Sequence, residues 1–330
     1  FFRDETWQLA GDGDFAGTFH LIKGAGAASD SFDLSGTFKS DLAGVNSYQF
    51  PALSGSLRWT PTTFEVSDAR SKFYGGSTQF AYSIAPLGRD IRPTSRFDAT
   101  LTNVDLATYT DLERLPGQRF AGRASGHILL EWPLGLLSER RGSASLSVVP
   151  PPGVHPMSAS LAATEAADAG HVRHEWGPFA PAPLPKHLPI AGELGVTFGP
   201  DEVEIGPSRF VTERTYIAFE GATMWGDRST LKFHATSADW QESDQVLVGL
   251  LHDFGSPATS VVLGGRGEFG GVMTGPFRSP RIEGTFSGDD IRARDVRLHS
   301  LIVTATHNPL LSAIVASLGA ALAESRVMTG

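Results

Sequence analysis

The chain has 330 residues, of which 41% are hydrophobic and 19% are charged, so it has enough apolar material for a substantial core. A net charge of -9 argues against nucleic acid as a partner, because binding the phosphate backbone needs a clustered basic face. The absence of cysteine excludes disulfides, thiol nucleophiles and thiolate metal sites.

A five-residue signature, with a glycine between two hydrophobic positions, recurs along the chain. Its copies are FAGTF (15–19), LSGTF (34–38), LSGSL (53–57), FAGRA (120–124), IAGEL (190–194), FGGVM (269–273) and IEGTF (282–286). Because alternate side chains of a strand share a face, each copy puts its apolar residues and its glycine on one side of a sheet. The chain is therefore predicted to be mainly β, an extended, repetitive antiparallel sheet with a few short helices.

A longer repeat is visible when residues 53–126 are laid over residues 190–275. Each copy starts with the glycine signature and continues with further alternating strands, a short helical segment and a last glycine-rich strand. Matches in one order along both copies predict two related β regions.

Two short helices are predicted where the hydrophobic spacing relaxes from two toward three or four. They cover Leu106 to Leu112 and Ser243 to Leu251, with caps at Asp105 and near Ser243. Helices of this length are expected to act as lids or plugs on a sheet.

The chain is predicted to fall into four regions. They are a first β repeat region (1–133), a proline-rich connection with edge strands (134–189), a second β repeat region (190–301) and an irregular tail or short helix (302–330). Within them, 158–170 is expected to be a loop or a frayed helix, and the apolar stretch 310–323 is too short to span a bilayer comfortably. Because the chain starts at Phe1, we expect it to be an internal piece of a longer protein.

Several short motifs resemble catalytic or cofactor sites, and each has a simpler structural interpretation. Gly265, Gly267 and Gly270 have the GxGxxG spacing of dinucleotide-binding turns, but the residues that follow do not favour the helix that such a site requires. His171 and His174 have no accompanying metal-binding motif. Acidic pairs of the kind that a glycosidase uses lie in glycine-flanked segments, where Asp is ordinarily a turn residue. These pairs are Asp12 with Asp14, and Asp289 with Asp290.

No sequence motif places a nucleophile beside a base, since the chain has neither a GxSxG elbow nor a phosphate loop ending in GK[ST]. We therefore predict a non-enzymatic protein with no cofactor and no metal. A β-rich glycosidase that uses the acidic pairs is the weakest of three functional hypotheses for this chain.

The apolar alternation is the remaining candidate for function. The candidate groove-lining residues are Phe64, Val66, Phe80, Tyr82, Phe97, Leu101, Val196, Phe198, Ile217, Phe219 and Phe233. They either form the core of an ordinary sandwich, which is the commoner role in a β protein, or line an open groove that acyl chains fill in place of a second sheet. Composition does not decide between these two interpretations.

Three segments carry a further pattern, in which a hydrophobic glycine strand is followed by Tyr-Gly-Gly and then by a proline closely before a hydrophobic-x-Gly element. These segments are 53–86, 96–106 and 271–298, and Tyr74 to Gly76 and Pro280 to Gly284 supply the last two elements. In this pattern the chain resembles the AsmA-like superfamily and, within it, the translocation and assembly module (TamB) family, over most of residues 10–300.

The resemblance implies a long sheet rolled into a half-pipe, an open groove with a hydrophobic interior, in a periplasmic protein anchored to the inner membrane through a segment absent from this chain. It implies a role in outer-membrane biogenesis through phospholipid transport between the membranes or, in older descriptions, through insertion or secretion of outer-membrane proteins. The implied partners are phospholipid acyl chains and an outer-membrane assembly protein. The alternative is a periplasmic or extracellular β-sandwich module that binds glycan or protein through Trp59, Trp132 and Trp225.

Overall fold

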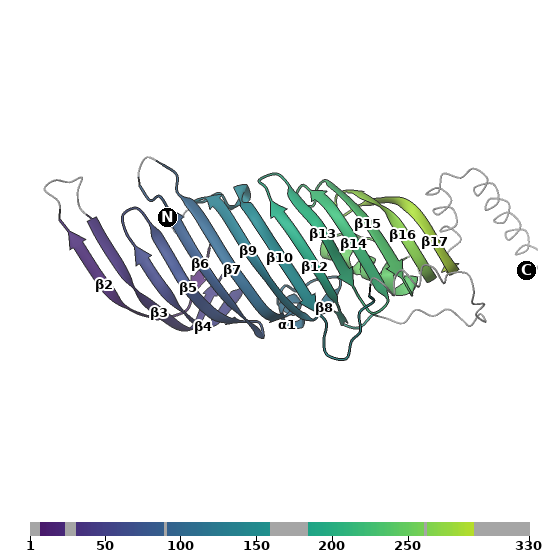
Figure 1. The fold of residues 1–330 in the computed structure, drawn as a ribbon, viewed down its shortest axis with the longest axis horizontal. Coiled ribbons are helices and arrows are strands. Elements are labelled where there is room, and N and C mark those ends of the chain that lie inside the picture. Colours follow the sequence, from purple (N-terminus) through teal and green to yellow (C-terminus); the bar gives the residue numbers. More distant parts are fainter. Residues whose placement is uncertain (1–6, 24–30, 89–90, 159–183, 261–262, 294–330) are drawn as a thin grey trace, which may run out of the picture. The chain divides into compact units, whose positions relative to one another are not determined.

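The computed structural model describes residues 7–23, 31–88, 91–158, 184–260 and 263–293 (Figure 1). Contacts divide the chain into two compact units. Unit 1 comprises residues 1–113, 121–149 and 193–206, and unit 2 comprises residues 114–120, 150–192 and 207–330.

Strands dominate both units. Those of unit 1 are β1 (Leu9–Ala10), β2 (Asp14–Ile22), β3 (Ser31–Val45), β4 (Tyr48–Trp59), β5 (Phe64–Phe73), β6 (Gly76–Ala85), β7 (Thr94–Asp105), β9 (Arg123–Pro133) and β10 (Arg141–Val149). Those of unit 2 are β11 (His187–Pro189), β14 (Thr215–Thr223), β15 (Ser229–Ser237), β16 (Leu263–Gly275) and β17 (Arg281–Ala293), while β8 (Arg119–Ala121), β12 (Ala191–Phe198) and β13 (Val203–Val211) have residues in both units. The helices are α1 (Leu106–Leu112) and the 3-10 turn η1 (Leu137–Glu139) in unit 1, and α3 (Trp240–Asp253) in unit 2.

Hydrogen bonding joins 15 strands in one antiparallel sheet and pairs β8 with β11 in a separate sheet of two strands. The order in the large sheet is β1-β3-β4-β5-β6-β7-β9-β10-β12-β13-β14-β15-β16-β17, with β2 also paired to β3. Among the described strands, the first and last in this order do not pair with each other, so the sheet is open. The predicted fold class, a mainly β chain built on an extended, repetitive and open antiparallel sheet with few helices, is confirmed.

The strand β10 lies between β9 and β12 in this order, whereas edge strands were expected in the proline-rich connection. The physical reason is the position of the prolines. β10 contains none, and the Pro150 to Pro152 run follows its last residue, so every N–H of the strand is available for pairing on both sides.

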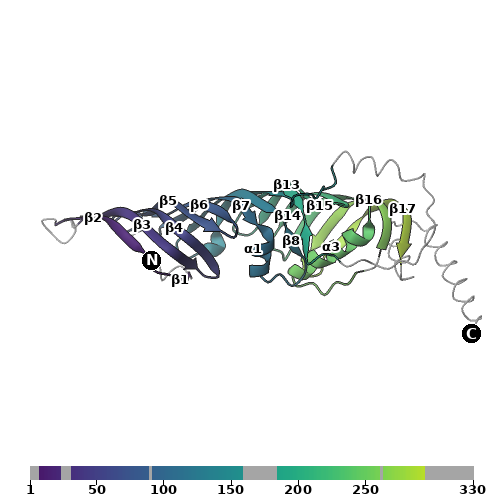
Figure 2. The ribbon, with the colours of Figure 1, turned by 90° about the horizontal axis from the view of Figure 1, so that it is seen from below.

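The longer repeat corresponds to a repeated order of elements. The first copy is β4-β5-β6-β7-α1-β9 and the second is β12-β13-β14-β15-α3-β16. In both copies the strands that flank the helix, β7 with β9 and β15 with β16, are hydrogen-bonded neighbours. Each helix therefore lies in a connection that leaves the sheet between two paired strands. In unit 2, α3 lies on one side of the strands (Figure 2).

Bulges keep the apolar residues of some strands on one face although their alternation is broken. The register of β5 against β6 shifts beside Asp68, which has a φ of 52°, a conformation that Asp and Asn adopt more readily than most residues. Without the bulge, Phe64 and Phe73 would point to opposite faces, because their positions in the strand differ by an odd number. Asn103, with a φ of 53°, does the same in β7.

The Tyr-Gly-Gly element is the tight turn between β5 and β6. Tyr74 and Gly75 have φ values of 40° and 78°, and Phe73 pairs with Gly76 across them. Two successive residues with positive φ form the type I′ turn, whose twist matches that of the flanking strands. The turn also brings the Tyr74 ring against α1, 6.1 Å from the ring of Tyr109.

The signature glycines lie where neighbouring strands approach closely. Gly17 in β2 and Gly36 in β3 are direct partners. A Cβ added to Gly36 would lie 2.4 Å from the carbonyl oxygen of Ala16 and 2.8 Å from Cζ of Phe15. The glycine therefore makes room for a neighbouring ring to lie along the sheet.

The predicted helix Leu106 to Leu112 coincides with α1, and the Thr108 hydroxyl donates a hydrogen bond to the carboxylate of Asp105 (2.7 Å). The predicted start of the second helix is wrong. α3 begins at Trp240, and the Asp239 carboxylate caps it by accepting from the N–H of Gln241 (3.1 Å). The five polar residues that follow Trp240, Gln241 to Gln245, carry no apolar spacing, which is why the first turn was missed.

Candidate functional site

The six candidate residues of unit 1 lie on one face of β5, β6 and β7. Val66 pairs with Tyr82, and Tyr82 pairs with Phe97, which makes one row across the strands. We call this surface the apolar face. Its members in β5 to β9 are Phe64, Val66, Ala69, Phe73, Phe80, Tyr82, Ile84, Phe97, Ala99, Leu101, Val104, Ala124, Ile128, Leu130 and Trp132. The structure therefore brings Phe64, Val66, Phe80, Tyr82, Phe97 and Leu101 together.

The opposite face of the same strands is polar and exposed. Asp98 accepts a hydrogen bond from the imidazole of His127 (2.8 Å), and Arg96 is paired with Glu131. Charged groups on one side and aliphatic and aromatic groups on the other make unit 1 a strongly two-sided sheet.

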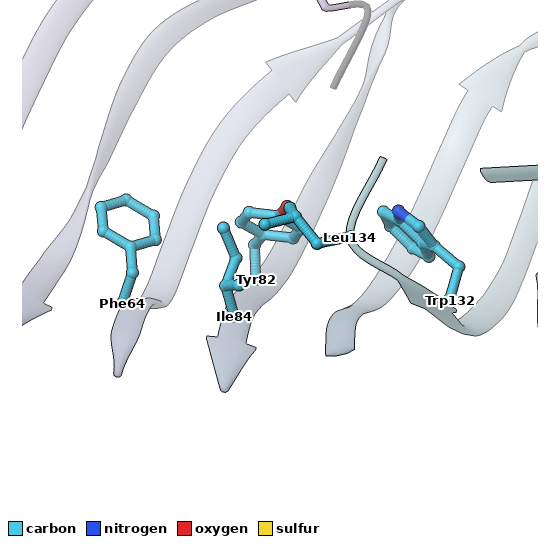
Figure 3. Packing of buried hydrophobic residues seen from close by; sticks show 5 residues of the cluster. All are labelled: Phe64, Tyr82, Ile84, Trp132 and Leu134. Carbon is cyan, nitrogen blue, oxygen red and sulfur yellow. The ribbon is translucent and has the colours of Figure 1, made fainter. Parts of the chain in front are cut away.

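One end of the apolar face is closely packed. Phe64, Tyr82, Ile84, Trp132 and Leu134 form a buried cluster, and their side chains converge from several strands (Figure 3). Among the candidates, Phe64 and Tyr82 are buried, each with 7% of its surface exposed.

A tryptophan missed as a candidate covers this cluster. Trp7 precedes β1, and its ring lies 5.3 Å from Tyr82 and 6.0 Å from Trp132. Backbone hydrogen bonding between Gln8 and Asn46 fixes the segment beside β3 (2.8 Å from the Asn46 nitrogen to the Gln8 oxygen). The sequence around Trp7 shows only the alternation of a short edge strand. This pattern does not predict that the Trp7 side chain packs on the apolar face.

The middle of the apolar face is less deeply buried than this cluster. The side chains of Val66, Phe80, Phe97 and Leu101 are only partly buried. Aromatic rings continue across it, with Phe80 5.9 Å from Phe50 and 6.0 Å from Phe97. In the part of the chain that the structure describes, the only sheet besides the large one is the pair β8–β11, so no second large sheet faces these side chains.

The other end of the apolar face lies beside α1 and carries phenols. We call Tyr48, Tyr74, Tyr109 and Glu113 the tyrosine cluster. The phenols of Tyr48 and Tyr109 lie beside each other and beside the carboxylate of Glu113. Burial raises the pKa of both phenols, and the neighbouring Glu113 carboxylate acts in the same direction. These residues escaped sequence analysis because bulges and a turn, and not simple alternation, place them here.

Unit 2 has its own apolar face, to which three candidates belong. Phe219 pairs with Phe233, and Ile217 pairs with Ala235 one row away. The rows continue into β16 and β17, where the rings of Phe269 and Phe286 lie 6.4 Å apart. All three candidates are half-buried.

The helix α3 packs on this face of unit 2. The ring of Trp240 lies 5.1 Å from that of Phe286. The Ser243 hydroxyl shares hydrogen bonds with Thr215 (2.7 Å) and Ser237 (2.6 Å), both of which are fully buried. Part of this face is therefore covered by the chain's own helix, in agreement with the expected lid.

The last two candidates lie on β12, which carries none of the others. Val196 and Phe198 share one face of β12, since Thr197 between them is exposed and both are half-buried.

The remaining motifs do not assemble a reactive site in the described residues. Gly265, Gly267 and Gly270 lie within β16, so no helix N-terminus follows them. Asp14 begins β2, and Asp12 precedes it in the link from β1. No group of three or more metal-ligating side chains occurs in the residues that the structure describes. His171, His174, the 302–330 tail with its 310–323 stretch and all of 158–170 except Ser158 lie outside the described residues, as do the side chains of Asp289 and Asp290.

The three tryptophans of the sandwich hypothesis differ in exposure. Trp59 and Trp225 are 38% and 40% exposed, whereas Trp132 is 3% exposed and belongs to the buried cluster. Trp132 is therefore part of the apolar face and does not provide an open platform for stacking a sugar.

Comparison with known proteins adds no relative. No protein-family model, no curated protein and no solved structure matches the chain. Over the described ranges, every helix is too short or too polar to cross a bilayer.

Proposed function

We propose that the apolar face binds the acyl chains of phospholipids, and that the chain serves as a non-enzymatic conduit for phospholipid between the inner and outer bacterial membranes. The observation that carries this proposal is the middle of the apolar face in unit 1. There Phe80, Phe97 and Leu101 are only partly buried, and no second large sheet faces them in the described part of the chain.

The free energy of acyl transfer is sufficient for this role. Burial of one methylene is worth about 0.8 kcal/mol, so an acyl chain of ordinary length gains on the order of 10 kcal/mol over water. Contiguous apolar side chains that remain partly exposed to solvent can mark a binding site. Acyl chains suit it because aliphatic and aromatic side chains make up most of it, and the Tyr82 hydroxyl on the same face is already hydrogen-bonded to Ser95 (3.2 Å).

Movement along the face would be passive. Apolar side chains recur from row to row along the face, so a bound acyl chain finds comparable contacts at successive positions. The resemblance to the TamB family supports the location in the periplasm, attachment to the inner membrane outside this chain and contact with an outer-membrane assembly protein. These remain parts of the proposal.

Purification without detergent, followed by lipid extraction and mass spectrometry, tests the proposal. We expect at least about one phospholipid per chain, since the gain on binding far exceeds thermal energy. Protein that emerges free of lipid, stays so after incubation with vesicles and binds oligosaccharide would instead support the glycan-binding alternative.

A further inference from the structure

The tyrosine cluster combines aromatic faces with a carboxylate, which is the chemistry that recognises ammonium groups. The rings of Tyr74 and Tyr109 are 6.1 Å apart and steeply inclined, at 73°. Tyr74 is also 4.6 Å from Phe73, whose ring lies 6.5 Å from that of Tyr48. Several ring faces therefore stand within a small volume.

A hydrogen bond holds the Tyr74 ring in place. The Tyr74 hydroxyl accepts from the backbone N–H of Gln49 (3.0 Å). The phenols of Tyr48 and Tyr109 lie beside each other and beside Glu113. The Tyr74 hydroxyl is thus occupied within the protein, and the aromatic surface that the three tyrosines leave partly exposed is what the cluster offers a ligand.

A carboxylate lies at this end of the face. Glu113 is exposed and is the carboxylate of the cluster. The nearby guanidinium of Arg123 donates to the carbonyl oxygens of Gly75 (3.2 Å) and Asn103 (3.3 Å), and its strand position alternates with Ala124 on the apolar face. Arg123 therefore belongs to the opposite face and does not neutralise Glu113.

The cluster adjoins apolar side chains that suit a lipid tail. Leu101, Leu106, Leu146 and Val148 pack with Tyr48, Tyr74 and Tyr109 around the same buried residues. An amphiphile with its tail on the apolar face would place its head group beside the tyrosines and Glu113.

We propose that the tyrosine cluster binds the alkylammonium head group of a zwitterionic phospholipid whose acyl chains lie on the apolar face. This inference rests on the proposed function and adds a preference to it. The carboxylate pairs with the ammonium charge, and the rings supply cation–π contacts, so lipids with an anionic glycerol head group are disfavoured.

Competition between two lipids with identical acyl chains tests this preference. The protein is incubated with vesicles of equal parts phosphatidylethanolamine and phosphatidylglycerol, re-isolated, and its bound lipids are quantified by mass spectrometry. We expect about fivefold enrichment of phosphatidylethanolamine, as one ammonium contact of ordinary strength provides. Substitution of phosphatidylcholine for phosphatidylethanolamine should preserve the enrichment, because both carry an alkylammonium group.

Single-residue variants distinguish recognition of the head group from binding of the acyl chains. Glu113→Gln and Tyr109→Leu should abolish the enrichment and leave the total bound lipid unchanged, and Glu65→Gln, an exposed carboxylate on the polar face of β5, should change neither. Lipid bound in the proportions of the vesicle, or enrichment that survives Glu113→Gln, would overturn the head-group site and leave the acyl-chain proposal intact. Absence of any bound lipid would overturn both.

Discussion

The ring of Phe38 in β3 lies over Gly55, its direct partner in β4. A Cβ added to Gly55 would come within 2.8 Å of Cζ of Phe38 and 3.0 Å of Cα of Ala69 in the next strand. The hydrophobic-x-Gly signature thus has a physical meaning, because a glycine in one strand gives an aromatic ring of its neighbour space to lie along the sheet. Phe15 covers Gly36 in the same manner.

Filling that space should destabilise unit 1. Gly55→Ala forces the Phe38 ring or the β5 backbone to move, and overpacking of this kind costs about 1–3 kcal/mol. Urea unfolding followed by circular dichroism measures the loss. Gly88→Ala is the control, since nothing lies within 4 Å of its added Cβ. Equal stability of the two variants would show that the ring does not need the glycine.

The bulge at Asp68 should tolerate some residues and reject others. Asp68→Val places a β-branched side chain at a φ of 52° and should cost about 1–3 kcal/mol, whereas Asp68→Asn or Asp68→Gly should be nearly neutral. Thermal unfolding of the three variants provides the comparison. Equal stability of Asp68→Val and Asp68→Asn would show that the β5 backbone is not strained at position 68.

Sequence periodicity predicted much of this fold but little of its detail. Period-two alternation identified the strands, and its relaxation identified Leu106 to Leu112, because both depend on residues adjacent in the chain. The bulges at Asp68 and Asn103 change which residues share a face, and their effect shows only when the register with a neighbouring strand is known.

The same limit applies to the candidate site. Phe64, Phe80 and Phe97 were predicted together because each belongs to a plainly alternating strand. Trp132 was assigned to an exposed binding surface and is buried, and Trp7 was not assigned at all. Both depend on contacts between residues more than 70 positions apart along the chain, for example Trp7 with Tyr82.

Asp253 should make unit 2 sensitive to pH. Its carboxylate accepts from the N–H of Gly117 (2.7 Å), while Oδ2 is buried without a hydrogen-bond partner. Burial raises the pKa of Asp253 above its usual value of 3.8, and the backbone hydrogen bonds only partly oppose this. The folded state therefore binds its proton more tightly than the unfolded state, so stability falls as pH rises above about 4.

Asp253→Asn removes this dependence and can still accept from Gly117. Its free energy of unfolding, relative to that of the parent protein, should increase between about pH 4 and pH 7. Urea titrations at several pH values measure the difference. A constant difference across that range would show that Asp253 has the same proton affinity in both states.

A charge on the apolar face should prevent lipid binding with little effect on folding. Phe80 is only partly buried, so Phe80→Glu leaves its carboxylate reachable by water, but it makes the neighbouring surface unfavourable for acyl chains. Bound phospholipid should fall by about tenfold or more. Phe219→Glu tests the equivalent position of unit 2, where α3 covers part of the face.

The matched control is Gln79→Glu, which introduces the same group on the opposite, exposed face of β6. It should retain its lipid, and all three variants should unfold within a few degrees of the parent protein. Loss of folding in Phe80→Glu together with an unchanged Gln79→Glu would indicate a closed core in place of an open face.

Site-specific photocrosslinking tests directly whether phospholipid contacts the apolar face. A photoreactive phenylalanine analogue is placed at position 80 or position 79, the protein is irradiated in the presence of phospholipid vesicles, and adducts are identified by mass spectrometry of the intact chain. An apolar face that binds acyl chains should give phospholipid adducts from position 80 and essentially none from position 79. Adducts of equal yield at both positions, or adducts from position 80 only to protein side chains, would contradict this expectation.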